Sequence, residues 1–93
     1  MAVTVPSTTY GGTASSASWA GAGPYTQTVS VSGVASINTV ILDLNLSSAL
    51  YADVPDLQTA YGLVYRAVPG TNSITLYATD TPAVSFDFYV TVI

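Results

Sequence analysis

Apolar and polar residues alternate along most of the chain after Pro24, and a period of two predicts strands that bury one face. The pattern begins at Tyr25–Ser32 and returns over residues 40–46, 63–68, 73–79 and 84–93. Short Gly, Pro, Ser or Asn segments separate these stretches, and 69–72 has the composition of a hairpin connection. We expect a mainly β fold, an antiparallel β-sandwich or small barrel of about five to six strands.

One segment has a different spacing. Val54, Leu57 and Tyr61 follow each other at intervals of three and four, as on one face of a helix. Asp53 is a suitable N-cap, and Gly62 is a natural C-terminal stop. The sequence therefore predicts one short helix over about residues 53–61.

The first part of the chain lacks a periodic apolar pattern and consists mainly of Gly, Ser, Thr and Ala. We therefore divide the chain into an extended N-terminal arm, 1–23, and a β-sandwich domain, 24–93. The arm is either a flexible lead-in or a segment ordered only against a neighbouring subunit. Trp19 favours the second alternative, because a large aromatic with an N–H group suits a contact that is partly apolar and partly wet. Val3 and Val5 could add a short edge strand.

Charge is scarce. Charged residues make up 6% of the 93 residues, where a typical soluble domain has about 25%. Arg66 is the only cation, there is no His, and all five acids are Asp. The polar surface must be built from hydroxyls and amides, which are cheaper to bury than charges. This composition is typical of surfaces that meet other protein surfaces, so we expect a module that is stable as part of an assembly.

The same composition excludes several partners. A net charge of −4 with one Arg cannot supply the electrostatic attraction that nucleic acid or an anionic membrane requires. No segment approaches the ~20 consecutive apolar residues of a membrane span. The start of the chain, 1–6, has no basic region followed by an apolar run, so we expect synthesis in the cytoplasm.

The residue types of most catalytic sites are missing. Without His, Cys or Lys there is no activated nucleophile of the usual kinds and no ordinary zinc site. Asp53 and Asp56 belong to the predicted helix start, whereas Asp43 and Asp87 lie on outward faces of predicted strands. No calcium-loop motif is present. We expect no enzyme activity and no catalytic, cofactor-binding or metal-binding residue.

Arg66 and the aromatic residues are the remaining candidates for contacts. Arg66 could pair with an Asp across its sheet or across a subunit boundary, or it could contact a ligand such as a glycan. Sugars also stack on aromatic faces, but packing explains most of the Tyr residues, namely Tyr25, Tyr61, Tyr65 and Tyr77. The better surface candidates are Tyr10, Trp19 and Tyr89. The candidate interface residues are Tyr10, Trp19, Tyr25, Arg66 and Tyr89.

Three motifs occur in order along the chain. The first is Trp19 followed by the segment Gly23–Val34, and the second is Tyr61–Arg66. The third is Ile74–Thr79 with a following Pro. Together they resemble a small β-rich structural module of tailed-bacteriophage virion proteins, and the similarity covers roughly residues 19–93. The module usually has charged residues in its helix and a basic C-terminal end, whereas this chain ends in Thr-Val-Ile.

The resemblance implies a non-enzymatic virion structural protein, with no catalytic residues to carry over. We expect a capsid decoration or head-fibre protein located in the virion. By analogy with phage fibres, its partners would be itself, as a homotrimer, and other virion proteins such as the major capsid protein. The alternative is a baseplate or tail-fibre adhesion module that binds host-surface glycan.

Overall fold

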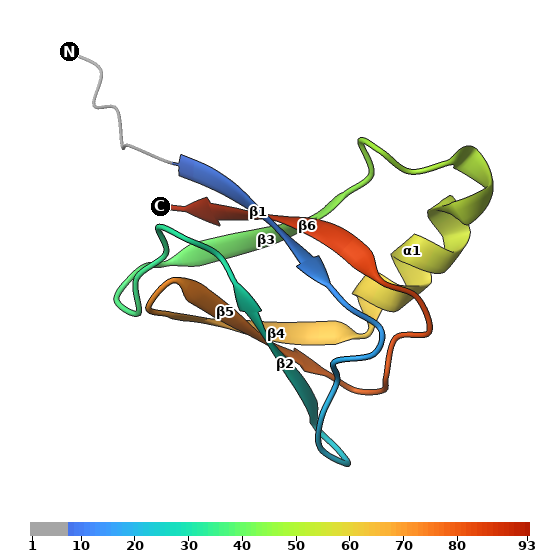
Figure 1. Ribbon diagram of the computed structural model, residues 1–93, viewed down its shortest axis with the longest axis horizontal. Helices are drawn as coiled ribbons and strands as arrows, with labels where there is room; N and C mark the ends of the chain where they lie inside the picture. Colours follow the sequence, from blue (N-terminus) through green and yellow to red (C-terminus); the bar gives the residue numbers. More distant parts are fainter. Residues whose placement is uncertain (1–7) are drawn as a thin grey trace.

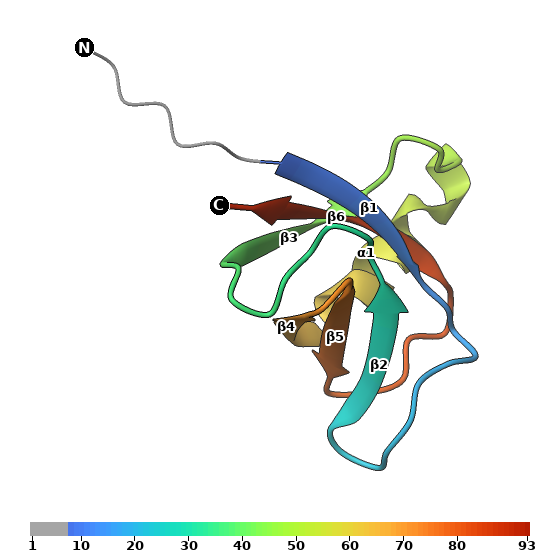
Figure 2. The same cartoon turned by 60° about the vertical axis from the view of Figure 1, so that its left-hand side comes forward.

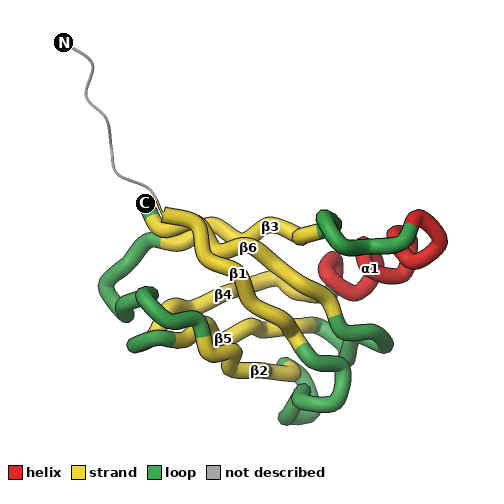
Figure 3. Tube along the Cα trace, turned by 45° about the horizontal axis from the view of Figure 1, so that its top comes forward, coloured by secondary structure: helices red, strands yellow, loops and turns green. Residues whose placement is uncertain are grey.

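Two strands with strict alternation, β5 (Ser73–Ala78) and β6 (Phe86–Val92), form the centres of two facing sheets (Figure 1). The computed structural model describes residues 8–93. Sheet A has the order β1-β6-β3, where β1 is Thr8–Ala14 and β3 is Val40–Asn45. Sheet B has the order β2-β5-β4, where β2 is Tyr25–Ser30 and β4 is Val64–Gly70. All pairs are antiparallel, and Figure 2 and Figure 3 show the two layers. The expected mainly β fold, a sandwich or small barrel of about five to six antiparallel strands, is confirmed as a sandwich of two three-stranded sheets.

The core lies between the two central strands. A central strand has neighbours on both sides, so its inward side chains are shielded from water more completely than those of edge strands. The largest fully buried side chains all come from β5 and β6, and they are Ile74, Leu76, Phe86, Phe88 and Val90. Burying each such side chain contributes about 1.5–3 kcal/mol. Phe86 and Phe88 also contact each other, with ring centroids 6.4 Å apart.

The predicted helix is confirmed as α1 (Val54–Gly62), which follows a 3-10 turn, η1 (Tyr51–Asp53), and lies at one end of the sandwich (Figure 1). Its residues Leu57, Ala60 and Tyr61 face the core. Asp53 occupies the N-cap position of α1, as expected, but its side chain makes no capping hydrogen bond. Because η1 runs directly into α1, Asp53 is itself helical (φ −92, ψ −14), whereas capping by the side chain needs an extended backbone. In the described part of the chain no helix is long and apolar enough to cross a membrane.

Part of the predicted arm lies within the sandwich. Thr8–Ala14 pairs with β6 as an edge strand of sheet A, and Ala14 is fully buried. Gly12 shows why the pattern was hidden: a Cβ at this position would lie 2.8 Å from the Phe88 ring, so only glycine fits here without a shift. Gly12 and Ala14 occupy inward positions of this strand, so its sequence shows little apolar alternation. Residues 1–7, with the edge strand expected at Val3 and Val5, lie outside the described residues.

Contacts within the chain also order the segment between β1 and β2, which was expected to order only against a neighbouring subunit. Gln27, 6% exposed, accepts a hydrogen bond from the Ser15 N–H (2.9 Å) and donates one to the Ser15 carbonyl (2.8 Å). Ala20 and Thr26 exchange two backbone hydrogen bonds of 2.9 and 2.8 Å. The Gln27 amide thus replaces a strand partner for Ser15 and joins the end of β1 to β2.

We expect Gln27→Leu to lower the free energy of unfolding by about 2–4 kcal/mol, because the Ser15 N–H and carbonyl would lose their partners in a partly buried site. Urea unfolding measures the change. Gln58→Leu on the exposed side of α1 is the matched control and should stay within about 0.5 kcal/mol of the parent. Equal effects of the two substitutions would show that the Gln27–Ser15 pair does not hold the segment.

Candidate functional site

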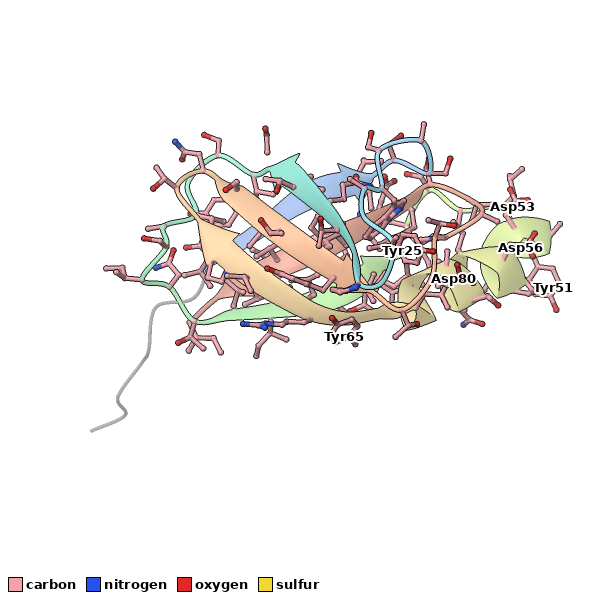
Figure 4. The ribbon with its side chains drawn as sticks, turned by 90° about the horizontal axis from the view of Figure 1, so that it is seen from below. Tyr25, Tyr51, Asp53, Asp56, Tyr65 and Asp80 are labelled. Atoms are coloured by element: carbon pink, nitrogen blue, oxygen red, sulfur yellow. The ribbon has the colours of Figure 1, made fainter. Side chains whose placement is uncertain are left out.

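A β-bulge in β4 turns two adjacent side chains to the outside of sheet B. Val64 pairs with Ala78 and Arg66 with Tyr77, so Tyr65 is an extra residue without a partner. Such a bulge breaks the in–out alternation and re-aims the side chains around it. Tyr65 is 57% exposed and Arg66 is exposed as well. Figure 4 shows Tyr65 on the outer side of the sandwich.

Tyr65, Arg66 and Tyr77 form a cluster on this outer face. The Arg66 guanidinium carbon lies 5.2 Å from the Tyr77 ring centroid, within the range of a cation–π contact. The Tyr65 and Tyr77 rings meet edge to face, with centroids 6.3 Å apart. Within residues 8–93, which contain all five Asp, no carboxylate lies within 4.0 Å of Arg66. The expected pair with an Asp of its own sheet therefore does not form, and the planar fork of N–H donors remains available.

A pocket of about 230 Å³ opens beside the cluster, between β3 and β4. Val40 and Leu42 of β3 supply apolar walls, and Tyr61 of α1 lines it with Arg66 and Tyr65. The Tyr61 ring contacts Phe86 edge to face, with centroids 5.8 Å apart. Burial raises the pKa of the Tyr61 phenol above 10.0, and the Asp43 carboxylate adds to the rise. The Tyr61 hydroxyl can donate and accept hydrogen bonds at the pocket.

Hydroxyl groups continue the outer face of sheet B next to the cluster. Thr26 pairs with Tyr77 across the strands, and the next row brings together Thr28 and Thr75. The two Thr hydroxyl oxygens of that row lie 3.0 Å apart. The cluster thus adjoins a polar, uncharged surface that can donate and accept hydrogen bonds.

The outer face of sheet A is a second surface, and it carries exposed apolar residues. Ile41 is 54% exposed, Tyr89 37% and Ile93 52%. The alternation of β3 and β6 places all three on this face, because Ile93 continues the ladder through its N–H bond to the Thr39 carbonyl (2.9 Å). Most of the other residues on the outer face of sheet A have hydroxyl groups or small side chains, and the only charged groups among them are the carboxylates of Asp43 and Asp87. These other residues are Thr9, Gly11, Thr13, Asp43, Asn45, Asp87 and Thr91.

A third feature is a pocket of about 430 Å³ between α1 and the end of sheet A, lined by Asp53, Asp56 and Asp87 among others. Figure 4 shows Asp53 and Asp56 at the far end of the molecule with Tyr51. Asp87 already accepts a hydrogen bond from the Thr13 hydroxyl (2.6 Å). Among residues 8–93, no group of three or more acidic side chains is placed to hold a metal ion.

The structure does not bring the five candidate interface residues together. Tyr10 and Trp19 are half-buried against the core, and Tyr25 is half-buried at the start of β2. Only Arg66 and Tyr89 are exposed, and they lie on opposite outer faces. The Trp19 Nε1 atom is buried and finds no hydrogen-bond partner among the described residues.

The cluster includes two residues that the sequence analysis assigned to packing. Tyr65 and Tyr77 lie on the outer face, so that assignment is wrong for them; Tyr61, in contrast, does pack against the core. One signal was present in the sequence. Tyr65 and Arg66 are adjacent in a strand, and two successive long side chains with polar tips interrupt the alternation.

Comparison of the chain with models of known protein families, with curated proteins and with solved structures gave no match.

The raised pKa of Tyr61 predicts a loss of stability in alkali. A folded-state pKa above 10.0 gives a stability contribution that is complete below the unfolded pKa and is lost as the pH rises through the folded pKa. We expect Tyr61→Phe to decline less with pH above 10.0 than the parent. Urea unfolding at a series of pH values measures this. Tyr51→Phe, 95% exposed, is the control and should follow the parent; a Tyr61→Phe curve that does the same contradicts the prediction.

Proposed function

We propose that the chain is a non-enzymatic structural module that assembles with copies of itself through the outer face of sheet A. By its resemblance to phage modules, the assembly is a homotrimeric capsid decoration or head fibre of a tailed bacteriophage. In this role it contacts the major capsid protein and is located in the virion. The exposed trio Ile41, Tyr89 and Ile93 on one sheet face is the observation that carries the proposal.

The low charge of the chain supports this role. A small soluble domain usually covers about 25–35% of its surface with charged residues of both signs. Sheet A presents threonines, two carboxylates and three apolar side chains instead, and its outer face has no cation. Threonine pairs such as Thr9 and Thr91, whose hydroxyl oxygens lie 3.2 Å apart, can be covered at a lower desolvation cost than ion pairs.

A stable interface needs more area than the outer face of sheet A offers. A standard interface buries about 800 Å² per partner, about a seventh of the 5644 Å² surface of the chain. A face of three short strands is about 15 Å wide and about 20 Å long, so it cannot supply this area alone. Ile37, 91% exposed in the turn that leads into β3, is a further exposed apolar residue close to this strand in the sequence.

We expect the double variant Ile41→Lys and Tyr89→Lys to dissociate the assembly, because two ammonium groups would have to be desolvated in the interface. Sedimentation equilibrium measures the mass of the full chain. Deletion of residues 1–23 is a less selective test, since it removes β1 as well.

Tyr51→Lys is the matched control, because Tyr51 is 95% exposed but lies in η1, before the helix at one end of the molecule (Figure 4). It should leave the mass unchanged. A parent chain that stays monomeric at high concentration, or a double variant that keeps the parent mass, contradicts assembly through this face.

A further inference from the structure

We propose that the Tyr65–Arg66–Tyr77 cluster and the pocket beside it bind a sugar that carries a carboxylate, such as a uronic acid unit of a surface polysaccharide. This binding function lies beyond the assembly role and does not depend on it, because the cluster is on sheet B and the assembly face is on sheet A. The inference combines three features: an unpaired cation, an exposed aromatic ring and a small pocket at the same place.

Arg66 specifies the charge of the ligand. It is the only cation of the chain, and no carboxylate of residues 8–93 lies within 4.0 Å of it. Its contact with the Tyr77 ring, 5.2 Å from the centroid, holds the guanidinium in place without using its N–H donors for an ion pair. Such a planar fork matches the two oxygens of a carboxylate. The remaining surface is acidic, so recognition depends on this local contact and not on long-range attraction.

Tyr65 supplies a surface for the apolar side of a sugar ring. The axial C–H bonds of a pyranose form an apolar face, which packs on the electron-rich face of an aromatic ring. The bulge leaves Tyr65 57% exposed, and its edge contact with Tyr77 orients the ring. The hydroxyl of Tyr61, which lines the adjacent pocket, is a donor and acceptor of the kind that sugar hydroxyls require.

The pocket limits the size of the bound group. Its volume of about 230 Å³ is below the ~300 Å³ at which pockets begin to enclose drug-sized ligands. One sugar ring is a group of suitable size, with Val40 and Leu42 as the apolar wall. An acidic side chain of a protein partner could also pair with Arg66, but it would not use the Tyr65 ring or the pocket hydroxyls as contacts.

The test is an NMR titration of the full chain with methyl β-D-glucuronide, and in parallel with methyl β-D-glucoside, which differs in lacking the carboxylate. We expect the glucuronide to shift the signals of Tyr61, Tyr65, Arg66 and Tyr77. Its affinity should exceed that of the glucoside at least about tenfold, as expected for one charge-assisted bidentate contact. Sodium acetate serves as a third titrant, because it carries the carboxylate alone.

Two variants separate the contributions. Arg66→Gln should remove the preference for the glucuronide, and Tyr65→Ala should weaken both sugars several-fold while leaving the other signals of the folded chain in place. Tyr51→Ala is the control for an exposed Tyr elsewhere and should bind like the parent.

Three results would overturn the proposal. The first is that the glucuronide leaves the cluster signals unshifted. The second is that acetate binds as tightly as the glucuronide, which would make the cluster a site for carboxylate ions only. The third is that Arg66→Gln lowers the mass of the assembly, which would make the cluster a subunit contact. Failure of the sheet A variants to dissociate the assembly would affect only the proposed function.

Discussion

The structure depends on the packing of β5 against β6. Each is the central strand of its sheet, and each turns an uninterrupted row of apolar side chains toward the other. The outer strands then complete the sheets: where β1 lies beside β6, Gly12 leaves room for the Phe88 ring, which a Cβ would approach to 2.8 Å. On the side where β1 approaches β2, the buried Gln27 joins the layers through Ser15. On the other side, between β3 and β4, a pocket remains.

The apolar side chains of the central strands are buried in the core, and the outer faces of the two sheets differ in the residues that they expose. Sheet A turns Ile41, Tyr89 and Ile93 outward among threonines, which suits contact with another protein surface. Sheet B turns out hydroxyls together with the cation of the chain, which rests on Tyr77. A chain with so few charges cannot use ion pairs to organise both faces. Sheet A therefore relies on exposed apolar side chains for contacts, and sheet B on the single cation, Arg66.

The sequence predicted β2, β3, β5, β6 and the helix, because each buries a regular row of side chains. It also predicted β4, although a bulge interrupts the alternation of that strand. It did not predict β1, because the inward positions of that strand include Gly12 and Ala14, and such small residues give little apolar pattern. The site was predicted only in part. Arg66 and Tyr89 were identified as surface residues, but the bulge that places Tyr65 beside Arg66 depends on the register of β4 against β5, which alternation alone does not determine.

If a neighbouring copy covers the outer face of sheet A, tyrosine labelling should detect it. Iodination of the full chain, over a range of protein concentrations, compares Tyr89 with Tyr51, which are 37% and 95% exposed in the single chain. We expect Tyr89 to lose its reactivity as concentration rises, whereas Tyr51 remains reactive throughout. Reactivity of Tyr89 that stays constant over the same range would contradict coverage of this face.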